Sequence, residues 1–498
     1  MGTSRFREIA GSSAKVGVAT VASLLGWVVG GKILALELGA AGVGVFGLLR
    51  QLQQNLTILG TFNGSTALVQ GMAVRSGDDR SSYSRTVARL YAAGGGVVAL
   101  VLLVGAPWLG PWLVPDPQGP ALLRWLALAV LATTAQAYYT SVLTAGRAVD
   151  SLVRSQLMGP VAVLLLAWPM ALLVQAGRPA GLVMMLAVPG AAVAVGARIR
   201  ARRAGLLGTG PGARFEVKDV RAFFRMAGVL LFTGLLTTGT QYLQSRLAAG
   251  YLGLDQAGLF WVAWTLSMSY VSVILGSYGT YYMPALSALT EPVARHALIR
   301  DYLRLAQLVM PLLVAMVVLF KPWVVLLMFS DSLLPSLQVM RWMLVGDYFK
   351  GIAWVLSFPM LAFGELRWFL WTEVSFNVGL AGAAWGWLSL GGTIESLGIL
   401  FLAGYIAYLA VVWGYIWVEH RFRVLPSEIA RFMAGLGLVV GMSAATWTER
   451  RVTASSTLLF LVLSAVFVVI TVGPARISGW VHSTAARRRK RPPEGGRP

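Results

Sequence analysis

The sequence contains no cysteine and only three histidines, and charged side chains make up 12% of its 498 residues. Without cysteine the chain can form neither disulfides nor thiolate metal sites. His296, His420 and His482 lie in polar stretches between or after apolar segments, which argues against a buried histidine metal site or an intramembrane proton relay. Because globular domains average about 25% charged residues, the low charge excludes the soluble, disordered and collagen-like classes.

Apolar residues fill most of the chain. They make up 57% of the sequence, the mean hydropathy is +0.70, and this is enough for about fourteen spans of about twenty residues each. The expected spans are residues 14–36, 42–72, 86–114, 121–145, 156–176, 180–198, 226–249, 258–287, 303–329, 337–363, 367–388, 397–418, 430–448 and 456–478. The sequence therefore predicts an all-α polytopic membrane protein.

Acidic residues are also scarce, with 20 Asp and Glu against 41 Lys and Arg, a formal net charge of +21. In a soluble protein this excess would suggest nucleic acid binding. Here the cations gather in alternate loops, and the opposite loops hold few, namely Arg124, Arg178, Arg341, Arg450 and Arg451. This is the positive-inside pattern. It predicts a multi-pass protein with both termini in the cytoplasm, and it accounts for the charge without a nucleic acid partner.

An internal repeat predicts the architecture. Four residues recur 214 positions later, pairing Leu38, Gly39, Gly44 and Phe46 with Leu252, Gly253, Gly258 and Phe260. The same offset pairs Lys32 with Arg246 and so equates the first span with the seventh. An even number of helices per repeat preserves orientation, which predicts two six-helix bundles related by an axis along the membrane normal, around a central cavity. The predicted parts are an N-terminal bundle at 1–213, a C-terminal bundle at 214–425, two additional helices at 426–480 and a basic disordered cytoplasmic tail at 481–498.

Ionisable residues inside spans are costly and are candidates for function. The candidates are Lys32, Arg50, Arg246, Asp347, Lys350 and Glu373. Their surplus of cations suits an anionic headgroup, and a guanidinium matches a phosphate with paired donors. Alternatively they are interhelical ion pairs or side chains that reach toward the interface. Asp347 and Lys350 are three residues apart on one helical face, so Asp347, like Glu373, is either an ion-coupling group or part of a structural pair.

Uncharged polar residues in the spans suit contact with sugars, although they also serve as interhelical hydrogen-bond partners. They include Gln51, Gln53, Gln54, Asn55, Asn63, Gln136, Tyr138, Tyr139, Gln241, Tyr242 and Gln244.

Several stretches resemble one transporter family. Lys32 is followed by Leu38-Gly39, Gly42, Gly44 and Arg50-Gln-Leu52, and three later stretches agree, YMPALSALTE at 282–291, LVGDYFK at 344–350 and RWFLWTEVS at 367–375. Over about residues 10 to 423 the chain resembles the Wzx-type flippases of O-antigen and enterobacterial common antigen precursors. These belong to the multidrug/oligosaccharidyl-lipid/polysaccharide exporter (MOP) superfamily.

The resemblance implies an inner-membrane transporter without enzymatic activity or cofactor, for polysaccharide biosynthesis. It would move an undecaprenyl-diphosphate-linked oligosaccharide between leaflets by alternating access, with Lys32, Arg50, Arg246 and Lys350 as substrate-binding residues. Membrane lipids and the polysaccharide polymerase and chain-length proteins would be its partners. A cation-coupled multidrug exporter of the same superfamily is the alternative. A membrane polymerase or ligase is a third interpretation, but the outer loops are short and lack histidine.

Overall fold

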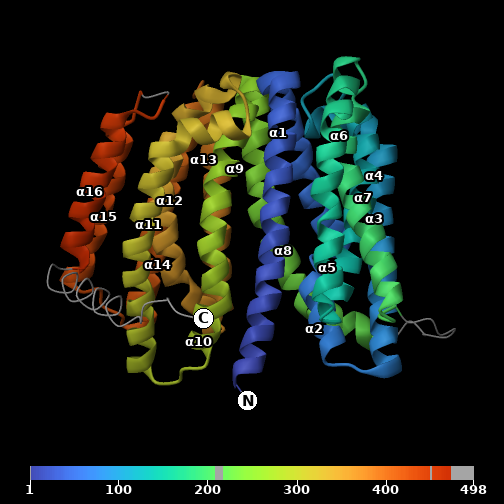
Figure 1. Ribbon diagram of the computed structural model, residues 1–498, viewed down its shortest axis with the longest axis horizontal. Coiled ribbons are helices and arrows are strands. Elements are labelled where there is room, and N and C mark those ends of the chain that lie inside the picture. Colours follow the sequence, from blue (N-terminus) through green and yellow to red (C-terminus); the bar gives the residue numbers. More distant parts are fainter. Residues whose placement is uncertain (1, 208–216, 449–450, 473–498) are drawn as a thin grey trace, which may run out of the picture. The chain divides into compact units, whose positions relative to one another are not determined.

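A computed structural model describes residues 2–207, 217–448 and 451–472, and every regular element in these ranges is helical (Figure 1). The chain divides into two compact units. The first consists of residues up to Val262 together with Val325–Ser336 and Glu373–Leu397, and the second consists of Ala263–Val324, Leu337–Thr372 and the residues from Gly398 onward. The predicted boundary after residue 213 and the predicted tail at 481–498 lie outside the described residues.

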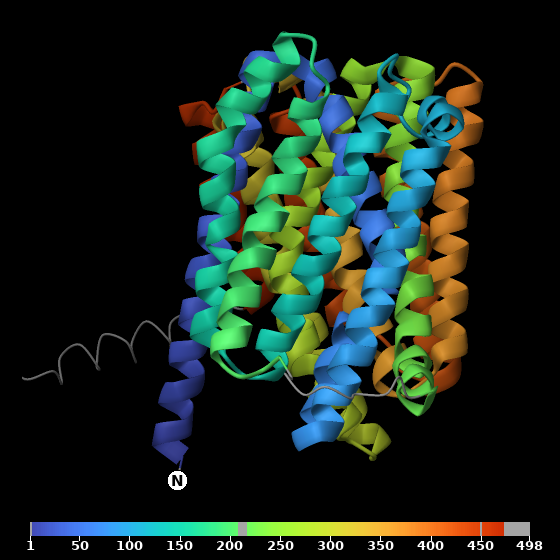
Figure 2. The same ribbon diagram turned by 90° about the vertical axis from the view of Figure 1, so that its right-hand side faces the viewer.

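The first unit is built from the N-terminal helices. These are α1 (Gly2–Thr61), α2 (Ser65–Ala73), α3 (Gly77–Leu113), α4 (Gly119–Ala145), α5 (Val149–Gln156), α6 (Met158–Gln175), α7 (Ala180–Arg203) and α8 (Val217–Leu252). The long helices α3, α4, α6 and α7 run side by side in both ribbon views (Figures 1 and 2). Small residues allow this close packing, since Ala106, Ala129, Ala171 and Ala197 are completely buried.

The remaining helices follow in chain order. They are α9 (Leu254–Ser277), a π-helical turn η1 (Tyr278–Tyr282), α10 (Met283–Ser287), α11 (Pro292–Met328), a 3₁₀ turn η2 (Asp331–Ser336), α12 (Leu337–Ala362), α13 (Leu366–Ser389), α14 (Ile394–His420), α15 (Pro426–Ala445) and α16 (Ala454–Val472). Helices α9, α11, α13 and α14 contribute residues to both units.

The predicted all-α polytopic membrane fold is confirmed. Among the described residues, ten helices are long and apolar enough to cross a membrane. The first of these, Leu25–Ala73, is 49 residues long and holds the second predicted span and the C-terminal part of the first, with the backbone break at Gly39 between them. The span predicted at 258–287 runs through α9, η1 and α10, and the spans predicted at 337–363 and 367–388 correspond to α12 and α13.

The internal repeat recurs in the backbone. Gly39 has φ of +62° where α1 breaks, and its repeat mate Gly253 has φ of +98° between α8 and α9. This left-handed region is the one that glycine occupies without a steric penalty. The two first helices of the predicted repeats therefore both end at a glycine with positive φ.

A second repeat pair forms a reciprocal contact within the first unit. A Cβ added to Gly44 would lie 2.1 Å from the carbonyl oxygen of Leu254, and one added to Gly258 would lie 2.2 Å from that of Ala40. Ala40 and Leu254 are themselves 214 positions apart. The two halves of the contact thus correspond under the 214-residue offset, and only glycine permits the backbones to approach this closely.

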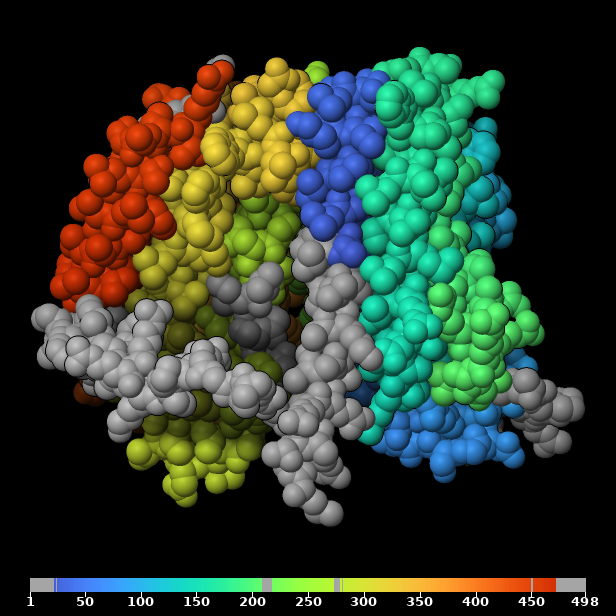
Figure 3. All heavy atoms as spheres, in the orientation of Figure 1, coloured from blue at the N-terminus to red at the C-terminus, as the bar shows by residue number. Residues whose placement is uncertain are grey.

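Helix α15 is anchored to α11 and α12 within the second unit. At its N-terminus the buried Glu428 accepts from the backbone N–H of Leu425 (2.9 Å) and pairs with Arg300 (3.3 Å). At its C-terminus the Lys321 ammonium donates to the carbonyl oxygen of Thr446 (3.2 Å). An anion at the N-terminus and a cation at the C-terminus both complement the helix dipole. Helix α16 lies beside α15 at the edge of this unit, with Leu458, Leu461 and Ile470 exposed (Figures 1 and 3).

Candidate functional site

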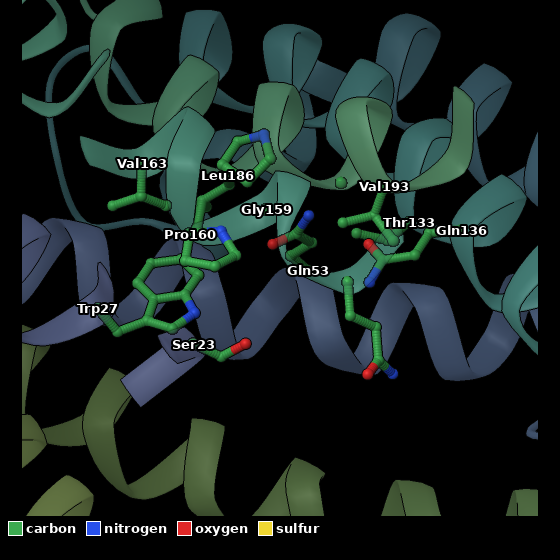
Figure 4. A pocket seen from close by; sticks show the side chains of 13 residues that line it. Ser23, Trp27, Gln53, Thr133, Gln136, Gly159, Pro160, Val163, Leu186 and Val193 are labelled. Atoms are coloured by element: carbon green, nitrogen blue, oxygen red, sulfur yellow. The ribbon is translucent and has the colours of Figure 1, made fainter. Parts of the chain in front are cut away.

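A polar cavity lies inside the first unit, among α1, α4, α5, α6 and α7 (Figure 4). Its volume is about 350 Å³. It is lined by Ser23, Trp27, Gln53, Thr133, Gln136, Gln156, Gly159, Pro160, Val163, Leu186, Pro189, Gly190 and Val193. None of these lining residues is ionisable. The cavity therefore offers hydroxyl and amide groups, one indole and an aliphatic wall, but no charge of its own.

The two ends of the cavity differ in chemistry. In Figure 4, Ser23 and Trp27 lie at one end and Thr133 and Gln136 at the other. Thr133 shares a hydrogen bond with Thr57 (2.7 Å), and the amide of Gln53 donates to the carbonyl oxygen of Ala129 (3.3 Å). Amides and hydroxyls in an uncharged setting can exchange hydrogen bonds with sugar hydroxyls, and an indole can cover the apolar face of a sugar ring.

Arg50 sits next to this cavity without lining it. Its guanidinium carbon lies 3.9 Å from the centre of the Trp27 ring, and Trp27 is a cavity residue. A guanidinium over an indole face is a favourable cation–π pair. Trp27 lies before the break in α1 at Gly39, and Arg50 lies after it. The contact between these two parts of α1 places Arg50 beside the indole end of the cavity.

The neutral polar residues of α1 divide into several environments. Gln53 lines the cavity, whereas Asn55 exchanges hydrogen bonds with Thr238 of α8, donating to its carbonyl oxygen (3.2 Å) and accepting from its hydroxyl (2.8 Å). Asn63 donates to the carbonyl oxygen of Leu230, also in α8 (2.6 Å). The amide of Gln51 is buried and has no hydrogen-bond partner among the described residues. Thus only part of the predicted polar set faces the cavity.

Lys32 and Arg246 do not line the cavity. Lys32 donates to the carbonyl oxygen of Leu326 at the end of α11 (2.5 Å), and Arg246 donates to that of Trp112 at the end of α3 (2.6 Å). All four residues belong to the first unit. Both predicted substrate-binding cations therefore bind helix ends in this conformation, and their contact with substrate stays a prediction.

Asp347 and Lys350 form a buried pair in the second unit, 3.5 Å apart and both fully enclosed. Asp347 also accepts from the hydroxyls of Ser267 (2.7 Å) and Tyr270 (2.6 Å). The Lys350 ammonium is surrounded by three aromatic rings at 5.4–5.5 Å and by a methionine sulfur at 3.2 Å, from Trp354, Phe401, Tyr405 and Met268. The geometry provides the pairing that the three-residue spacing suggested.

The remaining predicted residue, Glu373, is half-buried in α13 and accepts a long hydrogen bond from Asn377 one turn later (3.4 Å). Within the described ranges, no three histidine, aspartate or glutamate side chains gather in a way that could hold a metal ion. The sequence interpretation overlooked Lys321, which is 1% exposed although it lies in the predicted span 303–329. The signal was available, since a lysine inside an apolar span is conspicuous. It also overlooked Trp27, because an aromatic residue in an apolar span does not stand out as a charged one does.

Comparisons with known proteins agree with this fold. The family model described as "Polysaccharide biosynthesis protein" matches residues 33–338. The chain is similar to the lipid III flippase of Escherichia coli (strain K12), with 26% identity over 408 residues that cover 77% of this chain and 92% of that protein. The corresponding protein of Shigella flexneri matches to the same extent.

Solved structures show the same architecture at low sequence identity. The lipid II flippase MurJ in an inward closed conformation aligns with a TM-score of 0.63 and 12% identity, covering 92% of this chain and 98% of that one. An inward-facing multidrug resistance transporter of the MATE family, in the MOP superfamily, aligns with a TM-score of 0.60 and 13% identity over 86% of this chain and 95% of that one. These likenesses concern the fold.

Proposed function

Because the chain belongs to the polysaccharide biosynthesis protein family, we propose that it is a flippase for a lipid-linked oligosaccharide. Its substrate would be an undecaprenyl-diphosphate-linked oligosaccharide, moved from the cytoplasmic to the outer leaflet of the inner membrane for cell-surface polysaccharide assembly. The similarity to lipid III flippases over 77% of this chain supports the substrate class. Translocation breaks no covalent bond, so the proposal needs neither a catalytic residue nor a cofactor.

The observation that carries the proposal is the chemistry of the cavity in the first unit. It is lined by three glutamines, a threonine, a serine and an indole, with no ionisable group. The Arg50 guanidinium lies against that indole. An uncharged polar lining beside a cation suits a molecule with sugar hydroxyls and a phosphate. A cation exporter would instead be expected to place a carboxylate in its cavity.

The proposed mechanism is alternating access between two six-helix repeats, at 1–213 and 214–425, that are related by an axis along the membrane normal. The reciprocal contact of Gly44 with Gly258 supports this repeat. We assign Lys32, Arg50, Arg246 and Lys350 as the cations that the diphosphate meets during the cycle, and Asp347 and Glu373 as candidates for ion coupling. Both termini would lie in the cytoplasm, and the proposed protein partners are the polymerase and chain-length proteins of the same assembly process.

A leaflet-resolved assay in proteoliposomes tests the function. The purified protein should flip a fluorescent undecaprenyl-diphosphate oligosaccharide, whereas protein-free vesicles should not. A lipid-free cationic dye, the substrate of a multidrug exporter, should not be transported. Equal transport of the dye would favour the exporter instead.

The cavity is tested with the single change Gln136→Leu, which removes an amide from its lining, and with Gln118→Leu as a matched control in the exposed turn before α4. Slower flipping in the first variant alone is expected, because a lost hydrogen bond weakens sugar binding by about 0.5–1.5 kcal/mol. Unchanged flipping in both variants would remove the cavity from the transport path.

A further inference from the structure

The end of helix α3 is held by a basic side chain from α8. Arg246 donates from Nε to the carbonyl oxygen of Trp112 (2.6 Å) and from Nη2 to that of Pro111 (3.3 Å). Tyr242, one turn earlier on α8, donates to the carbonyl oxygen of Leu113, the last residue of α3 (2.5 Å). The last four carbonyls of a helix have no partner within it and form the negative end of its dipole, so a cation satisfies both requirements.

The end of helix α11 is held in the same way from α1. Lys32 donates from Nζ to the carbonyl oxygen of Leu326 (2.5 Å), in the last turn of a helix that ends at Met328. Just beyond that helix, the hydroxyl of Ser330 donates back to the carbonyl oxygen of Ala35 on α1 (3.3 Å). These residues, like those at the end of α3, all belong to the first unit.

The two arrangements correspond residue by residue. The donors Lys32 and Arg246 are 214 positions apart, and so are the acceptors Trp112 and Leu326. The 214-residue offset rests on residues 38–46 and 252–260, not on Trp112 or Leu326. These two residues accept through backbone carbonyls, so the identity of their side chains is not part of the repeat. In each case the first helix of one repeat holds the third helix of the other. Together these four residues and their hydrogen bonds are called the double clamp.

We propose that the double clamp is a gate that keeps the predicted outer end of the transport path closed. This inference rests on the proposed function, because a gate has meaning only for a transporter. By the positive-inside pattern, α3 and α11 both end at the outer face, and both cations lie near the outer ends of their own spans. Since each clamp joins the two repeats, any outward opening that separates them at this end must break both.

The double clamp also gives the two cations a role besides substrate contact. When the outer end opens, Lys32 and Arg246 leave the helix carbonyls and become available to another acceptor. An anionic headgroup is such an acceptor, and by binding the freed cations it would stabilise the open form relative to the closed one. The clamp on α3 has the additional hydroxyl of Tyr242, whose repeat position is Val28, whereas the clamp on α11 is accompanied by the hydrogen bond from Ser330.

Thiol labelling tests the gate without any substrate. The chain has no cysteine, so a single introduced cysteine is the only reactive thiol. Ala35 and Ala249 are another repeat pair, 2% and 5% exposed, beside the two cations. Ala35→Cys and Ala249→Cys should react slowly with a membrane-impermeant maleimide added from the outer side. Adding Lys32→Met or Arg246→Met should raise the labelling rate about tenfold, because the closed population falls when a clamp is lost.

Matched variants separate the clamp from a general loss of stability. Lys32→Arg and Arg246→Lys keep a donor and should label at the original rate. Arg178→Gln removes an exposed cation from the same predicted face and should change labelling less than about twofold. Unchanged labelling of both cysteines in the folded Lys32→Met, Arg246→Met double variant would overturn the proposal.

A covalent lock provides a second test that leaves Lys32 and Arg246 in place. A flexible bis-maleimide that joins Ala35→Cys to Ser330→Cys, at positions that are in contact between α1 and the end of α11, should block flipping in proteoliposomes, whereas the two single-cysteine proteins treated alike should remain active. Full activity of the joined protein would contradict the gate. If the unmodified protein flips no lipid-linked oligosaccharide but the labelling results hold, the proposed substrate is wrong and the gate stands.

Discussion

The contact partners of several charged side chains in this fold cannot be predicted from residue type alone. Lys350 is a lysine that no solvent reaches, enclosed by aromatic rings and by its partner Asp347. Lys32 and Arg246 bind carbonyl groups. Lys32 and Arg246 are half-buried, whereas Lys350 has exchanged water for its partners in the protein, which is the condition under which a buried charge is tolerated.

The buried pair predicts a characteristic pattern in a double-mutant cycle. Asp347→Asn or Lys350→Met alone should destabilise the protein by about 3–5 kcal/mol, because each strands one buried charge. The double variant should recover most of that loss, since a thioether suits the aromatic surroundings of Lys350. Thermal unfolding of the purified variants measures the effect.

The same cycle addresses ion coupling. If Asp347 carries a proton during transport, the recovered double variant should fold but lose its response to a pH gradient. Gradient-driven flipping at the original rate in that variant would leave Asp347 with a structural role alone.

The reciprocal glycine contact yields a second prediction at this scale. Gly44→Ala should destabilise the protein by about 1–3 kcal/mol, as overpacking does, because the added Cβ would lie 2.1 Å from a backbone oxygen. Gly228→Ala in α8 is the control, since nothing lies within 4 Å of its added Cβ. Equal melting temperatures for the two variants would contradict the close approach.

The sequence identified the donors of these contacts but not their acceptors. Lys32 and Arg246 stand out because cations are rare in spans, and the 214-residue offset pairs them. The carbonyl groups of Trp112 and Leu326 could not be found by residue type, since every residue carries a carbonyl. The 214-residue offset relates Trp112 to Leu326, so it could predict one acceptor only if the other were already known.

At the scale of elements, hydropathy located the spans because a helix in lipid must satisfy its backbone internally and cover itself with apolar side chains. The break in α1 at Gly39 agrees with a boundary between two predicted spans. The sequence did not reveal how α15 packs. Its anchors are Glu428, Lys321 and Tyr348, and the last of these donates from its hydroxyl to the carbonyl oxygen of Phe432 (2.9 Å).

These anchors make α15 part of the packing of the second unit, and this leads to a prediction on truncation. A chain that ends after residue 425 should unfold at a lower temperature, because it leaves the hydroxyl of Tyr348 and the ammonium of Lys321 without the acceptors that α15 supplies. A chain that ends after residue 450 keeps α15, loses α16 and the residues beyond it, and should lose less stability. Similar melting temperatures for both truncations would show that α15 is dispensable for folding.

At the scale of the whole molecule, the positive-inside pattern predicts the topology. Ser76→Cys and Ser81→Cys should be labelled from the cytoplasmic side, and Ser332→Cys from the outer side. Ser76 and Ser332 are exposed and Ser81 is half-buried, and no native thiol interferes. Labelling of all three from the same side would refute the predicted topology and, with it, the outward position of the double clamp.

The contact between Gly44 and Gly258 has a consequence for the history of the chain. A residue that meets its own repeat mate occupies the place of a self-contact in a symmetric dimer. In a six-helix ancestor that paired with a second copy of itself, one codon would have set both sides of this contact. Any larger side chain would have appeared twice at the same point. Fusion of two such copies would have released the two positions to change separately, and today Lys32 and Arg246 differ while Gly44 and Gly258 are the same.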